Sequence, residues 1–169
     1  DDPNQEPVGQ IVKSAARAAA MTRQLLTFSR TQTVSPHVVN VGAALHDLGY
    51  LVDYRKHHLH GYYLVTNAAL DAFDPREIEI VAHVARYHRG AAPKRRHESF
   101  AALESWQREI VRRLSALLRV ANALDRTHAA RVVELYAALV KGKPVVVEVL
   151  SPFDVSLELA AARQGAELF

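Results

Sequence analysis

Four of the nine histidines of this chain lie between residues 42 and 63, in the stretch GAALHDLGYLVDYRKHHLHGYY. One of them, His46, is followed directly by Asp47, and apolar residues flank the pair on both sides. A carboxylate in such surroundings is costly to bury unless it is paired or binds a metal ion, and imidazole and carboxylate both suit divalent cations. Neighbouring residues point about 100° apart on a helix, so both side chains reach one ion only at a seam between helices. The doublet is therefore a candidate metal site, and ordinary hydrogen bonding of a His and an Asp is the alternative.

Further potential ligands occur near the ends of later helical segments. Leu118, Asn122 and Asp125 share one face of a long helix, because they are spaced by four and then three residues. That face turns polar toward the carboxyl end. His88 lies close to the end of the preceding helix, where a cation also suits the helix dipole. His83 and His128 have the pattern of partly exposed helical histidines.

Basic residues are concentrated in the two connections that carry histidines. The first connection contains His57 and His60. The basic residues of the two connections are Arg55, Lys56, Arg89, Lys94, Arg95 and Arg96. Guanidinium and ammonium groups suit phosphate oxygens, so we expect a groove for polyphosphate or a nucleotide. The alternative is a pair of solvated loops. Aromatic residues for base stacking are sparse nearby, which disfavours nucleic acid as the ligand.

The composition is that of an ordinary globular domain. The 169 residues are 49% hydrophobic and 23% charged, and no apolar run approaches the ~20 residues that a membrane helix needs. The absence of cysteine excludes disulfides and zinc–thiolate sites, and it fits a cytoplasmic location. The net charge of +3 matters only if it is concentrated in one place.

The pattern of apolar residues predicts a mainly α fold, a helical bundle with a small C-terminal β appendage (α+β). We expect helices over 8–30, from the Ser35-Pro36 cap to about 48–52, over 62–70, from Asp74 to Gly90, and over 105–127. The polar RKHHLHG segment is predicted to be irregular. The segments VVELYAALV and VVVEVL predict two strands around a turn, and the alternation in VSLEL favours a third strand.

Three stretches occur in an order that resembles the C-terminal HD domain of the exopolyphosphatase / guanosine pentaphosphate phosphohydrolase family. They are the doublet stretch through YRKHH, the FDPREIEIVAHVARYHR stretch, and RRLSALLRVANALDRTH, and the resemblance covers about residues 42–169. HD domains use a histidine from an earlier helix, the His-Asp doublet and a later Asp to hold a metal ion. The resemblance thus implies a divalent ion (Mn, Fe, Ni or Mg) at His46 and Asp47, with His58 and His88 as extra ligands and Asp125 as the later acid. The usual later position holds Asn122, and Gln10 or a neighbour stands where the first histidine belongs.

Residues 8–40, with the run AARAAAMTRQLLTFSR, resemble instead the second dimerisation helix of a histidine kinase. This predicts a leader over 1–7, a kinase-like helix and linker over 8–40, an HD-like helical domain over 41–131, and a small β region over 132–169 packed on the helices. A junction of two families near residues 41–42 would be either a natural fusion or an engineered chimera.

Three functions remain open at this point. The first is an accessory HD domain that binds polyphosphate or a guanosine polyphosphate with little or no hydrolysis. The second is an active metal-dependent phosphohydrolase acting on phosphoanhydride or phosphoester bonds, and the third is a helical interaction module that forms a homodimer. Because Gln10 and Asn122 replace two usual ligands, binding is placed above catalysis.

Overall fold

The structure is a computed structural model that describes residues 36–138 and 146–166. The predicted leader over 1–7 and the predicted helix over 8–30, with Gln10, lie outside the described residues. The helices are α2 (Pro36–Leu45), the 3-10 helix η1 (Leu48–Leu51), α3 (His57–Thr66), α4 (Pro75–Tyr87), α5 (Glu98–Ala102), α6 (Ser105–Leu124) and α7 (Ser156–Gly165). The two strands are β1 (Glu134–Ala138) and β2 (Val146–Leu150), paired antiparallel with Tyr136 opposite Glu148. The mainly α fold with a small β element near the C-terminus is confirmed.

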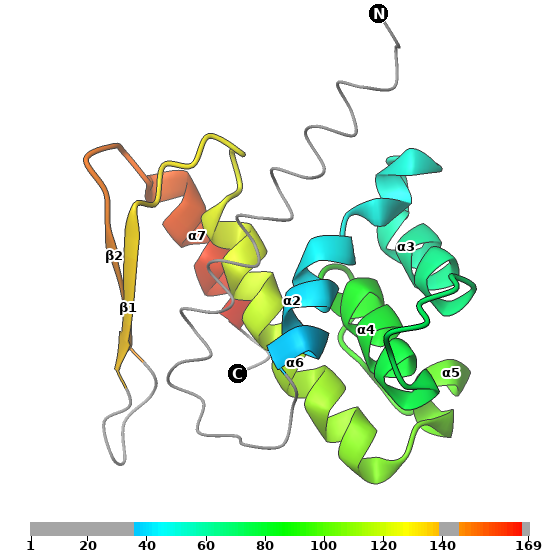
Figure 1. The fold of residues 1–169 in the computed structure, drawn as a ribbon. Coiled ribbons are helices and arrows are strands. Elements are labelled where there is room, and N and C mark those ends of the chain that lie inside the picture. The colour runs from blue at the N-terminus through cyan, green and yellow to red at the C-terminus, as the bar shows by residue number, and fades with distance from the viewer. Residues whose placement is uncertain (1–35, 139–145, 167–169) are drawn as a thin grey trace, which may run out of the picture.

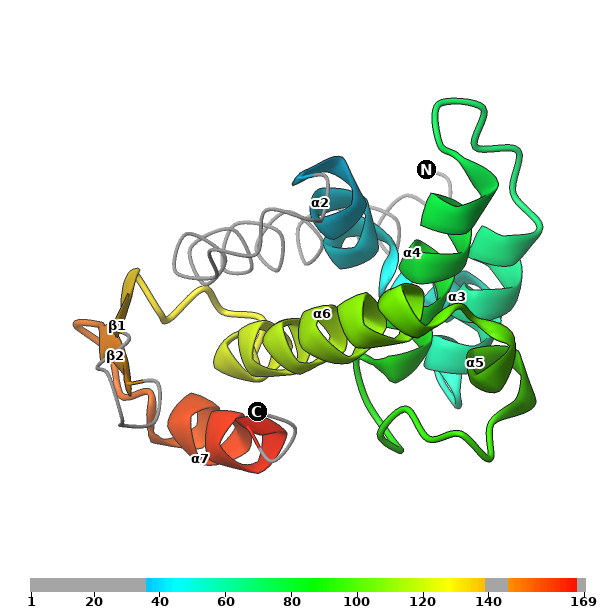
Figure 2. The ribbon, with the colours of Figure 1, turned by 90° about the horizontal axis from the view of Figure 1, so that it is seen from below.

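The long helix α6 runs through the middle of the molecule and joins its two ends (Figures 1 and 2). Helices α3, α4 and α5 gather at one end, α2 lies beside the middle of α6, and the strand pair and α7 lie at the other end. The buried face of α6 follows the helical period with Ile110, Leu114, Leu118 and Ala121, and α4 packs against it. This packing places the carboxyl ends of α2 and α4 close to the start of α3, where the chemistry-bearing residues lie.

Helix α4 begins as its sequence predicts. Asp74 accepts a hydrogen bond from the backbone N–H of Arg76, and Glu77 reaches back to the backbone N–H of Asp74. This capping box satisfies backbone donors that the first turn would otherwise leave open. The helix ends at Tyr87, earlier than the predicted end at Gly90. Gly90 has a φ of 69°, the left-handed conformation that glycine adopts without strain, and the chain turns there.

Two predicted elements are wrong. The RKHHLHG segment is not irregular throughout, because α3 starts at His57 and places His57 and Gly61 against η1 and α4. The VSLEL segment is not a strand but the first part of α7, which packs on α6. Its alternation is too short to decide the period, and the alanines that follow favour a helix.

The doublet itself does not lie within a helix as predicted. Helix α2 stops at Leu45, and His46 and Asp47 form the turn that leads into η1.

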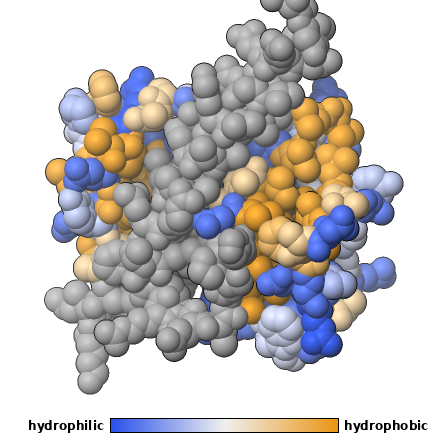
Figure 3. Space-filling view, viewed as in Figure 1, coloured by the Kyte–Doolittle hydropathy of each residue, from blue (hydrophilic) through white to orange (hydrophobic). Residues whose placement is uncertain are grey.

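Apolar residues lie on either side of the grey segment on the face seen in Figure 3. In the described part of the chain, no helix combines the length and apolar character that crossing a bilayer requires.

Candidate metal centre

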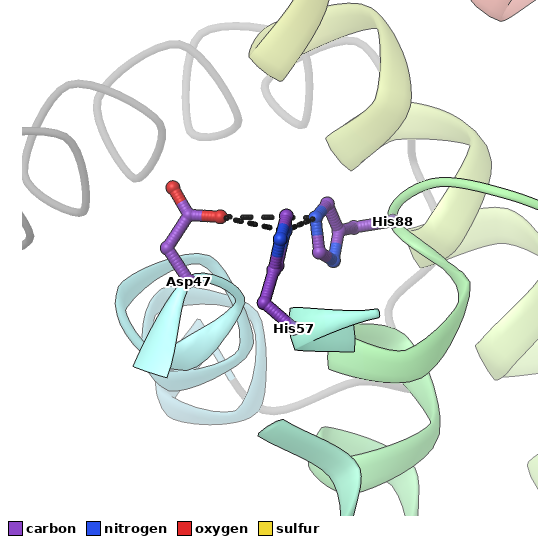
Figure 4. A group of neighbouring side chains, drawn as sticks. All are labelled: Asp47, His57 and His88. Atoms are coloured by element: carbon purple, nitrogen blue, oxygen red, sulfur yellow. Dashed lines mark hydrogen bonds and ion pairs between the residues drawn. The ribbon is translucent and has the colours of Figure 1, made fainter. Parts of the chain in front are cut away.

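Three buried side chains from three elements meet at one point (Figure 4). Asp47 comes from the turn after α2, His57 is the first residue of α3, and His88 follows the last residue of α4. Their exposed fractions are only 3%, 1% and 2%. The carboxylate Oδ1 of Asp47 lies 3.5 Å from Nε2 of His57 and 3.7 Å from Nε2 of His88, and the two Nε2 atoms are 3.2 Å apart. We call these three residues the metal group.

Backbone carbonyls fix the orientation of each imidazole. Nδ1 of His57 lies 3.1 Å from the carbonyl oxygen of Tyr54, and Nδ1 of His88 lies 2.6 Å from that of Ala85. A carbonyl oxygen only accepts hydrogen bonds, so each Nδ1 carries the proton and donates it. In the neutral rings, both Nε2 atoms therefore point a lone pair toward the same place.

This arrangement is repulsive without a cation between the donor atoms. Two nitrogen lone pairs and a carboxylate oxygen face one another at 3.2–3.7 Å, and the group contains no donor of its own to join them. Metal–ligand bonds of about 2.1 Å in tetrahedral geometry separate the ligand atoms by about 3.4 Å. The residues present thus fit a divalent ion held by three protein ligands, with further positions left for water or a ligand.

The electrostatics of the group suit this role. Burial lowers the pKa of His57, and burial together with the charge of His46 lowers the pKa of His88 well below its usual value. Both rings are then neutral at pH 7, as metal ligands must be. Burial alone would raise the pKa of Asp47, but the contact with His46 and its charge outweigh it and lower the pKa to about 2.

His46 contacts Asp47 from the other side, and its pKa is raised, whereas those of His57 and His88 are lowered. Its Nε2 is 3.1 Å from Oδ2 of Asp47, the oxygen that faces away from the other two histidines, and its Nδ1 is 2.6 Å from the Ala43 carbonyl oxygen. Burial would lower the pKa of His46, yet the Asp47 carboxylate, the Ala43 carbonyl and Asn122 together raise it. The contact between Nε2 of His46 and Oδ2 of Asp47 is therefore the ion pair of a protonated imidazole with a carboxylate, and both groups are buried.

The structure brings together only part of the predicted ligand set. Asp47 and His88 meet as predicted, His46 adjoins them, and Asn122 contacts His46 from α6. His57, which the sequence pattern placed with the basic loop, occupies the position predicted for His58. In the part of the chain that the structure describes, His58, His60 and Asp125 do not belong to the metal group.

Two of these residues have other surroundings. His58 packs beside Gly90, and burial lowers its pKa to about 4. Asp125 ends α6 as a buried residue 3.6 Å from His128, which is exposed as predicted. The prediction that His83 is partly exposed is wrong. Its exposed fraction is 2%, because Tyr62 of α3 and Phe100 of α5 pack against it.

Sequence patterns gave no sign of Gly49, which nevertheless allows the metal group to form. A Cβ atom at this position would lie 1.8 Å from the His57 carbonyl oxygen and 2.6 Å from the Gly61 nitrogen. Only glycine lets η1 approach α3 so closely. A glycine two residues after the doublet carries no meaning in the sequence until the contact with α3 is known.

Tyr50 was missed for a similar reason. Its ring centroid lies 3.9 Å from that of His57, and Tyr54 stacks on it at 5.4 Å. Burial and the Asp47 charge raise the pKa of Tyr50 to about 12, although the charge of Arg89 opposes this.

Arg119 of α6 holds the chain that follows His88. Its Nε donates to the Tyr87 carbonyl oxygen at 2.8 Å, and its Nη2 donates to those of Gly90 and Ala91 at 2.7 and 3.1 Å. These bonds satisfy carbonyls that the end of α4 leaves open. They therefore fix the backbone on both sides of His88.

The predicted basic residues are all exposed. Within residues 36–138 and 146–166, no carboxylate lies at ion-pair distance from any of them: Arg55, Lys56, Arg89, Lys94, Arg95 and Arg96. Their charges are thus not neutralised by acidic neighbours in that part of the chain.

The comparisons with known proteins agree on one family. Residues 7–156 match the family model described as Ppx/GppA phosphatase, domain III. The chain is also similar to a guanosine-5'-triphosphate,3'-diphosphate pyrophosphatase of Pseudoalteromonas translucida (strain TAC 125), with 29% identity over 99 residues. That alignment covers 59% of this chain and 19% of the relative, so the chain spans about a fifth of that protein's length.

The family match passes through the predicted junction at residues 41–42 without a break. The comparison therefore gives no boundary there, and the kinase-like helix and the HD assignment stay predictions. Since the model covers most of the sequence, the chain belongs to the Ppx/GppA phosphatase domain III family.

Proposed function

We propose that this domain holds one divalent cation through Asp47, His57 and His88, and that it binds a phosphorylated polyanion as an HD-type accessory domain of a Ppx/GppA phosphatase. The observation that carries the proposal is the convergence of two tethered imidazole lone pairs on one buried carboxylate. Such a group is repulsive when empty and favourable when it surrounds a cation.

The polyanion follows from the charge around the metal group. Arg55 and Lys56 lie directly before His57, and Arg89 follows His88 directly, so each histidine ligand has an exposed cation next to it. Cations in this setting attract phosphate oxygens. We propose polyphosphate or a guanosine polyphosphate as the ligand, in keeping with the family and with the substrate that the name of the Pseudoalteromonas relative gives.

The residues divide the work between them. A bound ion supplies Lewis-acid chemistry at the positions that the protein leaves open. His57 and His88 donate nitrogen lone pairs, Asp47 supplies the negative charge, and His46 orients that carboxylate through Oδ2. Two imidazoles favour Mn, Fe or Ni over Mg, because Mg prefers oxygen ligands.

Hydrolysis is a second candidate, and a specific observation favours it. Three protein ligands with open positions is the arrangement of catalytic rather than structural metal sites. Against it, the α6 residue that reaches His46 is the neutral Asn122, so it adds no negative charge. We therefore place binding first.

The test uses the whole 169-residue chain purified without chelator. Metal content is measured by mass spectrometry, and binding of inorganic tripolyphosphate is measured by calorimetry with and without EDTA. We expect about one equivalent of metal and binding that weakens when the metal is removed. His57→Ala should lose the metal, whereas His58→Ala, its neighbour outside the metal group, should keep it.

The two functions separate in the same samples. Release of inorganic phosphate that depends on metal and is lost in His57→Ala would favour the phosphohydrolase. Binding without release would favour the accessory domain. A chain that takes up no metal at saturating Mn²⁺ and ignores tripolyphosphate would exclude both.

The remaining predictions need separate tests. A homodimer built on the kinase-like helix over 8–40 predicts a mass of twice the monomer in light scattering that persists on dilution. The cytoplasmic location rests on the absence of cysteine alone.

A further inference from the structure

Tyr54 has the largest exposed fraction of any aromatic side chain in the part of the chain that the structure describes, 72%. It lies in the connection between η1 and α3, three residues before His57 of the metal group. A large ring gains free energy when a partner covers it, and tyrosine is common where proteins bind ligands. The ring is therefore a place where a ligand of the metal group can make a second contact.

Ring contacts on one side hold Tyr54 next to the metal group. Its centroid lies 5.4 Å from that of Tyr50, with 28° between the two planes, and 6.3 Å from that of His57. The centroid of Tyr50 lies 3.9 Å from that of His57, so the three centroids make a nearly right angle at Tyr50. His57 and Tyr54 are thus not on opposite faces of Tyr50. The two tyrosines form neighbouring parts of one aromatic surface beside His57.

The backbone that carries this ring is held as well. The carbonyl oxygen of Tyr54 accepts a hydrogen bond from Nδ1 of His57 at 3.1 Å, and the backbone N–H of Arg55 donates to Oδ1 of Asp53 at 2.9 Å. Both bonds hold the same peptide group, the one that joins Tyr54 to Arg55. A side chain that is already held in this way loses little conformational freedom when a ligand covers it.

The groups around the ring match the parts of a nucleotide. Every nucleobase has a planar π-face that stacks on an aromatic side chain. Arg55 and Lys56 follow Tyr54 directly, and both are exposed cations that suit phosphate oxygens. A guanosine polyphosphate has a base for the ring and phosphates for the cations and the metal ion, whereas inorganic polyphosphate has no group that stacks.

We propose that Tyr54 stacks on the base of a nucleotide whose phosphates bind at the metal group and its neighbouring cations. The proposal rests on the proposed function, because it selects the guanosine polyphosphate from the two ligands named there. It makes Tyr54 the residue that distinguishes a nucleotide from inorganic polyphosphate. Stacking alone tolerates either purine, so this contact does not separate guanine from adenine.

Calorimetry with two probes on the full chain loaded with Mn²⁺ tests this role, with metal content measured in every sample. The probes are GTP and inorganic tripolyphosphate, which both carry three linked phosphates but differ in the base. Tyr54→Ala should weaken the binding of GTP about tenfold and change that of tripolyphosphate less than about twofold. Tyr54→Trp should keep the affinity for GTP, whereas Tyr54→Leu, which is apolar but has no π-face, should lose most of the stacking contribution.

Tyr63→Ala is the matched control, because Tyr63 lies within α3 with an exposed fraction of 66% and should affect neither probe. Equal losses of GTP affinity in Tyr54→Ala and Tyr63→Ala, or no loss in either, would overturn the stacking role.

Loss of the metal in Tyr54→Ala, or equal weakening of both probes, would also overturn it, because Tyr54 would then act by building the metal group. A wild-type chain that binds tripolyphosphate but not GTP would overturn the stacking role and leave the proposed function intact. If the loaded wild-type chain binds neither probe, the proposed function itself fails.

Discussion

Two groups of side chains that contain buried histidine lie among α3, α4 and α5, and only the first of them has the geometry of a metal site. In the metal group, His57 and His88 face Asp47. In the second, the aromatic cluster, His83 packs against Tyr62, Tyr87 and Phe100 at ring-centroid distances of 5.0, 6.1 and 6.2 Å. His83 is as buried as His88, and its Nδ1 also lies against a backbone carbonyl, that of Glu79 at 2.8 Å.

The difference between the clusters lies at the other ring nitrogen. In the described part of the chain, aromatic rings surround His83 and no carboxylate forms an ion pair with it, whereas Nε2 of His57 and of His88 meet the Asp47 carboxylate. In both clusters, burial keeps the imidazole neutral, and a backbone carbonyl accepts the proton on Nδ1. Only a shared anionic target turns it into a candidate ligand.

The largest expected effect comes from removing that target. Asp47→Asn keeps the shape of the side chain but removes the negative charge, so we expect the affinity for Mn²⁺ to fall at least about 100-fold, more than the loss of an outer partner causes. The measurement is competition with a metal-binding dye.

His83→Gln is the control in the aromatic cluster and should leave Mn²⁺ affinity unchanged. If the two substitutions weaken binding equally, the clusters do not differ as the geometry indicates.

The second largest expected effect is a loss of stability at low pH that comes from the metal group and not from the aromatic cluster. The lowered pKa of Asp47, about 2, gives stability that is present above the usual carboxyl pKa and is lost as the pH falls from about 4 to about 2. The difference from the ordinary value of 3.8 corresponds to about 2 kcal/mol. Denaturant unfolding of the metal-free chain, followed by circular dichroism at several pH values, measures it.

At higher pH, the histidines of both clusters determine how the free energy of unfolding changes with pH. The lowered pKa values of His57, His88 and His83 mean that the unfolded chain binds more protons below pH 6.5, so stability falls as the pH falls from there. The raised pKa of His46 acts above pH 6.5, where its contribution is lost as the pH rises. Asp47→Asn should reduce the loss of stability between pH 4 and 2 by about 2 kcal/mol, leaving the part that Asp154 and Glu158 contribute, and His83→Phe should not reduce it. If the free energy of unfolding of Asp47→Asn fell between pH 4 and 2 as much as that of the wild type, the lowered pKa of Asp47 would be contradicted.

Arg119 should matter to the metal group more than to the aromatic cluster. Arg119→Ala leaves the carbonyls of Tyr87, Gly90 and Ala91 without their donor, which loosens the backbone around His88. We expect about a tenfold loss of Mn²⁺ affinity, similar to the loss of other outer partners of metal ligands.

Arg113 is the matched control on the same helix, because among the described residues it pairs with Glu109 at the surface. Arg113→Ala should leave metal affinity unchanged and lower the free energy of unfolding by at most about 0.5 kcal/mol. Equal effects of the two substitutions on metal affinity would mean that Arg119 does not position His88.

The smallest expected effect concerns the start of α3. Lys56 precedes His57 with a φ of 56° and no side-chain cap, whereas α4 starts with a complete capping box. Asparagine tolerates this conformation and caps helices well, so Lys56→Asn should raise the free energy of unfolding by about 0.5–1 kcal/mol. Thermal unfolding measures the gain, and a loss of stability would show that the lysine stem contributes packing there.

Local signals in the sequence predicted what depends on local structure. The DPRE run predicted the start of α4, and the spacing of Leu118 and Asn122 predicted the polar face of α6 that reaches His46. The antiparallel strand pair was also predicted, since valines fill most of β2 and two valines, Val132 and Val133, directly precede β1.

Residues whose role depends on tertiary contacts were not predictable in the same way. His57 and His58 are adjacent and chemically identical, and only the start of α3 decides which of them faces Asp47. Gly49 and His83 depend on which helix packs against them, and no periodicity within their own segments specifies that. The sequence therefore indicated a metal site at the doublet, but the tertiary structure was needed to select its ligands.

An anomalous-difference map from crystals of the Mn²⁺-loaded chain, collected at the manganese edge, tests the central claim most directly. We predict one dominant peak within about 2.1–2.3 Å of Oδ1 of Asp47 and of Nε2 of His57 and His88. No peak at saturating Mn²⁺, or a peak bound by His58 or Asp125 with His57 uninvolved, would contradict the account.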